Sequence, residues 1–324
     1  MKPVVLLILD GWGYSSQSHG NAISNASTPN LNKILRNYPS LLLQASGKAA
    51  GMTWGEPGNS QVGHLTIGAG RAIFQYMSRI NKAIATGEFF DNEVLKKSVE
   101  HVKTNNSKLH LAGLLTSGSV HAFLSHLLAL IDLASKNGVP NLKVHIFTDG
   151  KDSGLKEGAI ILKKVQDYLA KTGIGSVASV IGRDFAMDRN KNWDFTNKTY
   201  DLMARGAGES TDNVLKKMEE LYAAGITDSK IPPLILDKTG IVDENDALIF
   251  FNYREDSMGQ ITKSFIDSEF DIFPIKKFHN LFVVGMTPYL EDPRLNVAFP
   301  APKIKNGLSE VLSINGKKQF HIAE

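Results

Sequence analysis

A glycine-rich stretch around Ser60 holds the residues best suited to chemistry. Ser60 and His64 lie within the run 58–64, and further glycines lead up to Arg71. Glycines around a serine allow a tight turn that exposes the hydroxyl, and backbone N–H groups at a helix N-terminus there would stabilise an oxyanion or a phosphate. Judged by spacing alone, such a stretch is more often an ordinary glycine-rich loop than a catalytic or phosphate-binding turn. It also lacks the Gly-Lys-Ser/Thr ending of a Walker loop.

Asp10 is the second candidate, because it directly follows the apolar run 4–9 and precedes Gly11. Such a run predicts a strand buried on both faces, and open α/β sheets keep their sites at the carboxyl ends of such strands. Taken alone, Asp10 is equally well explained as a turn former. A carboxylate beside the presented Ser60 hydroxyl, however, is what a hard divalent cation needs to turn that hydroxyl into a nucleophile.

The elements that must position these residues alternate between strand and helix. Strands are expected at 109–115, 143–148, 176–181, 247–252 and 280–286, and helices at 121–136, 156–172, 196–204, 212–224 and 308–314. A further helix should begin at Thr28-Pro29, residues 298–302 should form a linker, and a short strand is expected at 319–322. This alternation indicates βαβ units and a mainly parallel sheet, so the fold class is α/β.

Composition excludes several classes of protein. The 324 residues suggest about two domains, and the absence of cysteine rules out disulfides, thiolate metal sites and cysteine nucleophiles. The net charge of +3 is too small for a nucleic-acid groove. The run 4–9 is far short of the ~20 residues that span a bilayer, so we expect a cytoplasmic protein with no membrane partner.

Several motifs spread over the whole chain, from Met1 to Glu324, point to one family. They include Leu9-Asp10-Gly11-Trp12-Gly13, Ala45-Ser46-Gly47, the stretch 58–71, Asp149-Gly150-Lys151-Asp152, Gly182-Arg183, Ala186-Met187-Asp188-Arg189 and Phe250-Phe251-Asn252-Tyr253-Arg254. In this order and register they resemble the cofactor-independent (2,3-bisphosphoglycerate-independent) phosphoglycerate mutases of the alkaline phosphatase superfamily.

The resemblance implies a discontinuous alkaline-phosphatase-like domain interrupted by an α/β transferase domain that holds the glycerate. Residues 1–74 would form the first phosphatase-like segment, 75–302 the transferase domain, and 303–324 the start of the return segment. The chain would correspond to the N-terminal portion of the family, ending before the C-terminal metal ligands. The phosphatase-like part would then expose a sheet edge and an apolar face, or need a missing C-terminal half supplied in trans.

The implied activity is the interconversion of 3-phosphoglycerate and 2-phosphoglycerate in glycolysis and gluconeogenesis, without added 2,3-bisphosphoglycerate. Ser60 matches the family's phosphorylated nucleophile, and Asp10 and Ser60 match ligands of the two divalent ions, usually manganese. The small-molecule substrate would be held by residues that match the family's phosphoglycerate-binding set: His121, Lys151, Asp152, Arg183, Arg189 and Arg254. Guanidinium forks suit phosphate and carboxylate, and a carboxylate orients a glycerate hydroxyl.

Departures from the family pattern keep other functions open. Ser257 stands where the family has a second arginine, and losing that fork costs roughly 1.5–3 kcal/mol of charge-assisted bonding. Other differences are Lys151 for an arginine, Gln61 for a glutamate, and Ser117, Ser119 and Phe123 for Asp, Gly and His. The alternatives are a non-catalytic phosphoglycerate-binding module or degenerate remnant and, third, a metal-dependent phosphotransferase with a different substrate.

Overall fold

The computed structural model describes residues 3–52 and 57–322. The chain divides into two compact units: unit 1 comprises Met1–Ser78 with Pro302–Glu324, and unit 2 comprises Arg79–Ala301. The boundaries predicted from the sequence follow residues 74 and 302. The assignment of the segments to phosphatase-like and transferase domains stays a prediction.

Unit 2 is built on one mainly parallel sheet, which has eight strands within the described residues, in the order β4-β5-β3-β2-β1-β6-β7-β8. The strands are β1 Leu109–Leu115, β2 Leu142–Thr148, β3 Ser176–Gly182, β4 Glu209–Ser210, β5 Leu234–Ile235, β6 Ala247–Phe250, β7 Phe282–Gly285 and β8 Asn296–Val297. Among these strands only the β3–β5 pairing is antiparallel, so β4 and β5 run together in the direction opposite to the other six.

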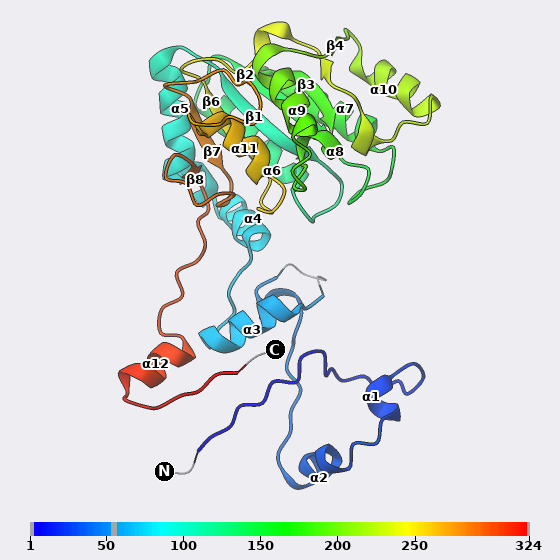
Figure 1. Cartoon of the computed structure of the whole chain (residues 1–324), viewed down its shortest axis with the longest axis vertical. Coiled ribbons are helices and arrows are strands. Elements are labelled where there is room, and N and C mark those ends of the chain that lie inside the picture. Colours follow the sequence, from blue (N-terminus) through cyan, green and yellow to red (C-terminus); the bar gives the residue numbers. More distant parts are fainter. Residues whose placement is uncertain (1–2, 53–56, 323–324) are drawn as a thin grey trace. The chain divides into compact units, whose positions relative to one another are not determined.

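The centre of the sheet is also the centre of the core. Every residue of β1 is buried, and Leu111 lies opposite Val144 of β2 and Ile249 of β6. Near-continuous apolar runs of this kind suit parallel strands covered on both faces. The covering helices lie on both sides of the sheet (Figure 1), where α6 packs on α7 and α9 packs on α11.

The helices of this part of the chain begin with α4 Tyr76–Thr86, which crosses the boundary between the units. They continue with α5 Glu93–Asn105, α6 Leu124–Lys136, α7 Gly158–Thr172, α8 Arg183–Ala186, α9 Trp193–Arg205, α10 Val214–Ala223 and α11 Gly259–Ile266. Short 3-10 turns are η2 Glu88–Asp91, η3 Asp228–Lys230 and η4 Lys238–Gly240. No helix of the described residues is both long enough and apolar enough to cross a bilayer.

Unit 1 contains helices and extended segments. Its elements are α1 Ala22–Asn25, α2 Pro29–Asn37, η1 Gly47–Ala50, α3 Ser60–Ala69 and α12 Leu308–Ile314. Helix α12 contacts α3, and the Arg71 guanidinium donates to the Lys305 carbonyl at 2.8 Å. Buried apolar side chains form a small cluster of Ala50, Met52 and Val62.

The strand predicted at 4–9 is wrong. The segment is not paired with any described strand, and all of its side chains are exposed. The short strand expected at 319–322 is also absent from the described structure. An extended segment needs a neighbouring strand to satisfy its N–H and C=O groups and to cover its side chains, and no described segment supplies one. The exposed apolar residues 41–43 lie in the same unit.

The central strands and helices predicted for unit 2 are confirmed, with ends that differ by a few residues. One difference matters for function: the helix predicted from residue 121 begins at Leu124, so 121–123 belong to the loop after β1. The strands β4, β5 and β8 were not predicted, because two residues carry no readable periodicity.

Candidate active site

The carboxyl edge of the sheet has a switch point at β1. From β1 the chain moves to β2 and β3 on one side, whereas β6 lies on the other side. Loops that leave neighbouring strands in opposite directions open a crevice, the usual ligand site of such sheets. The loop after β1 carries His121 and the loop after β6 carries Arg254. They are joined here, since the His121 carbonyl accepts from the N–H of Tyr253 at 2.9 Å and of Arg254 at 3.3 Å.

A buried group of charges forms the centre of this edge. His121 Nδ1 lies 2.6 Å from Asp152 Oδ2, and Arg183 Nη1 lies 3.0 Å from the same oxygen. Arg183 Nη1 also lies 2.5 Å from Asp149 Oδ1. His121 and Arg183 are only 7% and 8% exposed. We call His121, Asp149, Asp152 and Arg183 the inner cluster.

The strand ends determine where the inner cluster forms. Asp149 directly follows β2, and Arg183 directly follows β3 as the first residue of α8. The Asp149 carboxylate accepts from the Thr116 hydroxyl at 2.5 Å and from the N–H groups of Lys151 and Asp152 at 3.1 Å each. These bonds fold the loop 149–152 back toward β1, which places Asp152 against His121.

Burial and hydrogen bonds set the ionisation of the inner cluster. Burial, the largest influence, raises the pKa of Asp149, but the hydrogen bonds from Thr116, Asp152 N–H and Arg183 outweigh it and hold the pKa below its usual value. Burial lowers the pKa of His121, against the opposing hydrogen bond with Asp152. A neutral His121 with its proton on Nδ1 leaves Nε2 as a hydrogen-bond acceptor.

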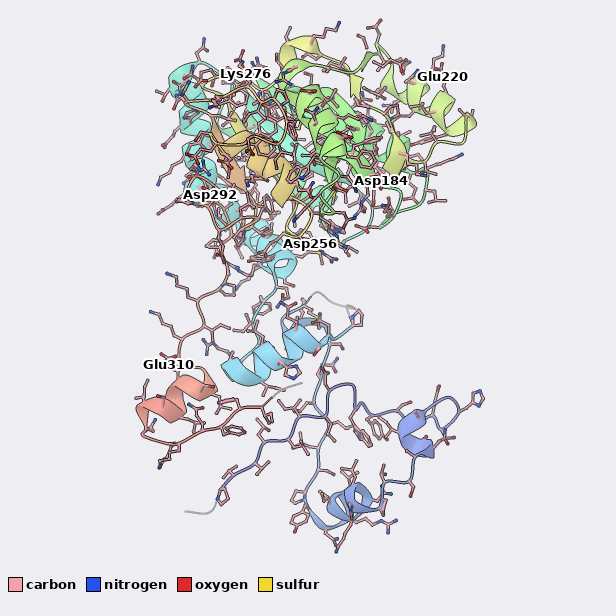
Figure 2. All side chains as sticks on the ribbon, viewed as in Figure 1. Asp184, Glu220, Asp256, Lys276, Asp292 and Glu310 are labelled. Carbon is pink, nitrogen blue, oxygen red and sulfur yellow. The ribbon has the colours of Figure 1, made fainter. Side chains whose placement is uncertain are left out.

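A second group of charges lies at the exposed rim. Lys151 Nζ pairs with Asp184 Oδ1 at 2.5 Å, and Arg189 pairs with Asp256. Arg254 Nε lies 3.1 Å from both Asp256 oxygens, and its Nη2 lies 3.0 Å from Oδ2. Figure 2 shows Asp256 at the lower edge of unit 2 as drawn, away from Lys276 at the upper edge. The structure therefore brings all six predicted phosphoglycerate-binding residues to one edge of unit 2.

The positions that depart from the family pattern are occupied by local packing. Ser117 donates to Glu157 Oε2 at 2.8 Å, and Phe123 packs edge-on against the His126 ring. Ser257 is 4% exposed, and its hydroxyl has no hydrogen-bond partner among the described residues. The short Ser257 side chain brings no guanidinium to this edge.

Ser60 and Asp10 meet in unit 1 although 50 residues separate them. Ser60 is the first residue of α3, which Asn59 caps by accepting from Val62 N–H at 3.0 Å. The Ser60 hydroxyl donates to Asp10 Oδ2. His64, one turn along, places Nδ1 2.9 Å from the Ser60 carbonyl. The hydroxyl thus lies at the positive end of a helix and has a carboxylate acceptor, a suitable setting for an anionic phosphoryl group.

Two oxygen donors do not make a divalent-metal site. Asp10 and Ser60 supply one carboxylate and one hydroxyl, whereas such ions take about six or more ligands, partly from water. Within residues 3–52 and 57–322 no group of three or more His, Cys, Asp or Glu side chains is placed to hold a metal ion. The described residues therefore do not complete a site for the two ions that the resemblance implies.

Asp149 and Asp256 complete this edge but were not among the predicted site residues. The signal for Asp149 was available, because it follows a buried strand just as Asp10 follows an apolar run. Asp256 carries no comparable signal: its proximity to Arg189, 67 residues away, exists only in the folded chain.

The comparisons with known proteins agree on one family. A family model described as "BPG-independent PGAM N-terminus" matches residues 80–291. A 2,3-bisphosphoglycerate-independent phosphoglycerate mutase of Methanococcoides burtonii is 43% identical over all of this chain and 64% of its own length. One from Clostridium novyi is 42% identical, with the same two coverages. The chain thus spans slightly less than two thirds of these relatives.

A solved structure extends the agreement to the fold. The phosphoglycerate mutase of Leishmania mexicana, crystallised at low cobalt concentration, superposes with a TM-score of 0.73 at 28% identity. The match covers 91% of this chain and 57% of the Leishmania chain. Since the family model matches well over half of the residues, the chain belongs to the family of the N-terminal region of BPG-independent phosphoglycerate mutases.

Proposed function

We propose that this chain is the part of a 2,3-bisphosphoglycerate-independent phosphoglycerate mutase that binds phosphoglycerate and carries the phosphorylated serine. The reaction is the interconversion of 3-phosphoglycerate and 2-phosphoglycerate, an isomerisation in glycolysis and gluconeogenesis. The observation that carries the proposal is the convergence of His121, Asp152 and Arg183 at the switch point of the sheet. The relatives that match the whole chain bear the name of this activity.

Unit 2 would bind and orient the glycerate. The guanidinium groups of Arg183, Arg189 and Arg254 present planar forks that match phosphate and carboxylate, and Lys151 adds a point charge. Because Asp149 and Asp152 hold Arg183 in a buried position, its fork is preorganised. The Asp152 carboxylate and Nε2 of His121 are the groups that would hold or move the proton of a glycerate hydroxyl.

Unit 1 would supply the nucleophile. The Ser60 hydroxyl donates to Asp10, which would take its proton as the oxygen attacks phosphorus. The bond from phosphorus to one glycerate oxygen breaks as the bond to Ser60 Oγ forms. The glycerate then reorients among the unit 2 side chains, and its other hydroxyl takes the phosphoryl group back. The N-terminus of α3 would stabilise the phosphoserine.

Divalent ions, manganese first among them, belong to this proposal as groups that lower the pKa of the serine hydroxyl. Asp10 and Ser60 would be the ligands from this chain. We assign the remaining ligands to a region corresponding to the rest of the relatives' length, joined to this chain or supplied in trans. The expected cytoplasmic location stays a prediction.

Calorimetry with 3-phosphoglycerate tests the binding half of the proposal. The chain should bind this ligand, and Arg183→Gln should weaken binding at least about tenfold, because one charge-assisted contact is worth about 1.5–3 kcal/mol. The matched control is Arg205→Gln, which removes a guanidinium paired with Asp201 on the surface helix α9. Absence of binding by the folded wild-type chain would contradict the proposal.

Phosphoserine detection tests the catalytic half. With manganese, 3-phosphoglycerate and the C-terminal region of a relative supplied in trans, phosphate should appear on Ser60. It should be absent from Ser60→Ala and present in Ser16→Ala, which removes another exposed serine of unit 1. Mutase turnover that Ser60→Ala leaves unchanged would contradict the proposed role of Ser60 as the nucleophile.

A second candidate is a phosphoglycerate-binding module without catalysis, and the Ser257 position favours it because no guanidinium comes from there. It predicts calorimetric binding with no phosphorylated Ser60 under any metal condition. The third candidate, a phosphotransferase with another substrate, predicts phosphorylated Ser60 from a different phosphorylated metabolite and not from phosphoglycerate.

A further inference from the structure

The two most exposed arginines of the candidate site share one carboxylate. Arg189 and Arg254 both contact Asp256 Oδ2, and the Nε of Arg254 also lies 3.1 Å from Oδ1. Arg254 presents Nε and Nη2 together, the side-on geometry in which a guanidinium grips a carboxylate or a phosphate. The Asp256 carboxylate thus occupies the donors that the proposed function needs for its substrate.

The carboxylates of the inner cluster are different. Asp149 and Asp152 face Arg183 with side chains 1% and 12% exposed, so their pairing is part of the buried structure. The rim side chains are much more open, with Arg189 53%, Arg254 44% and Asp256 37% exposed. Exposed ion pairs are weak because water competes for both partners. The Asp256 contacts therefore cost less to exchange than the buried contacts of Arg183.

Asp256 can leave the guanidinium groups by a simple movement. It is two residues from Arg254 in the loop after β6, and with its side chain more than one third exposed, rotation about its own bonds carries the carboxylate into water. His121 Nε2 lies 4.0 Å from Asp256 Oδ1, so the same rotation frees space beside the imidazole nitrogen that the inner cluster leaves available.

We propose that Asp256 is an internal competitor for the anion site: its carboxylate holds Arg189 and Arg254 in the ligand-free chain, and an incoming phosphate displaces it. The inference rests on the proposed function for the identity of the substrate but not for the competition itself. Because Asp256 is itself a carboxylate, another monocarboxylate gains little binding free energy by replacing it. The site then favours the doubly charged phosphate of a phosphate monoester.

Phosphate titration of matched variants tests the competition. Asp256→Asn keeps the shape of the side chain and removes its charge, and Asp167→Asn is the control, because Asp167 forms an exposed pair with Lys163 on α7. By calorimetry, inorganic phosphate should bind Asp256→Asn about twofold to thirtyfold more tightly than the wild type, the range for releasing two exposed ion pairs. Asp167→Asn should match the wild type within about twofold, the scatter of an uninvolved surface pair.

A second variant separates competition from positioning. If Asp256 only holds the arginines in place, Asp256→Asn binds phosphate equally or more weakly, and the proposal is overturned. If Asp256 competes, adding Arg254→Gln to Asp256→Asn should abolish the gain. A double variant that binds phosphate as tightly as Asp256→Asn would also overturn the proposal, as would the absence of phosphate binding in both wild type and Asp256→Asn.

The same titrations with 3-phosphoglycerate judge the proposed function separately. Tighter phosphate binding by Asp256→Asn, without 3-phosphoglycerate binding by any variant, would support the competitor and reject the substrate. Binding of 3-phosphoglycerate by the wild type, with no gain in either ligand for Asp256→Asn, would support the substrate and reject the competitor.

Discussion

Residues 4–9 of unit 1 and strand β1 of unit 2 are both continuous apolar runs, yet they have opposite environments. β1 is buried at every position between β2 and β6. Val4 is 96% exposed, and the run 4–9 has no paired strand among the described residues. The difference shows that an apolar run only favours a strand. A neighbour that accepts its hydrogen bonds and covers its side chains decides whether the strand forms.

The two candidate sites follow the same contrast. In unit 2 the inner cluster is enclosed, and its charges have partners within the unit. In unit 1, Ser60 and Asp10 are both exposed at the start of α3 and beside an unpaired segment. Unit 2 therefore presents an enclosed group of charges for the proposed binding role, whereas unit 1 presents an exposed hydroxyl, the proposed nucleophile, that further ligands would have to complete.

Amide hydrogen exchange should show the largest difference between the units. We expect the amides of β1, β2 and β3 to exchange more than about a thousandfold more slowly than those of 4–9, because exchange from a central strand requires extensive opening. The measurement is exchange followed by mass spectrometry of the whole chain. Equal protection of 4–9 and β1 would show that the two runs do not differ in burial and pairing.

Removing the buried guanidinium should have the next largest effect. Arg183→Met leaves Asp149 and Asp152 without their buried counter-ion and should lower the free energy of unfolding by about 3–5 kcal/mol. Arg254→Met, at the exposed rim, should cost less than about 1 kcal/mol. Urea unfolding followed by circular dichroism measures both. Similar losses would show that burial does not distinguish the inner cluster from the exposed rim of unit 2.

Truncating one leucine in each apolar run compares the runs directly. Leu111→Ala opens a cavity in β1 and should lower the free energy of unfolding by about 2–5 kcal/mol. Leu6→Ala, at a position 64% exposed, should change it by less than about 0.5 kcal/mol. The same urea experiment applies. A loss above 2 kcal/mol for Leu6→Ala would mean that residues 4–9 are buried in solution.

Acid sensitivity should be a property of unit 2, where burial lowers the pKa values of His110, His126 and His145. Burial lowers the pKa of His126 from 6.5 to about 3, so this side chain stays neutral in the folded chain while the unfolded chain takes up a proton. Between pH 6.5 and about 3, His126 therefore makes stability fall by about 1.4 kcal/mol per pH unit as the pH drops.

The variant His126→Leu removes one group that takes up a proton when the chain unfolds. Between pH 6.5 and 4, its free energy of unfolding should fall less steeply than that of the wild type, by about 1.4 kcal/mol per pH unit. Urea unfolding at several pH values measures the two slopes. Identical slopes would show that His126 is not the buried neutral side chain that the structure describes.

The sequence allowed much of unit 2 to be predicted and less of unit 1. The runs that became β1, β2 and β3 were recognised because each is long and lies between helices of readable period. Two-residue strands such as β4 and β8 were not, since they exist only through pairing. His121 was expected within a helix, but α6 begins at Leu124, which leaves His121 in the loop that meets Arg254.

By itself, the sequence determined the apolar runs, the alternation of strand and helix, and the motif residues that resemble one mutase family. Tertiary structure alone decided that β1 has neighbouring strands while 4–9 has none within residues 3–52 and 57–322. It also decided that Asp149 holds Arg183 and that Asp256 lies between Arg189 and Arg254. The physical reason is that hydrophobic period and backbone propensity act over a few residues. Strand pairing and ion pairing, in contrast, depend on distances in space between residues that lie far apart along the chain.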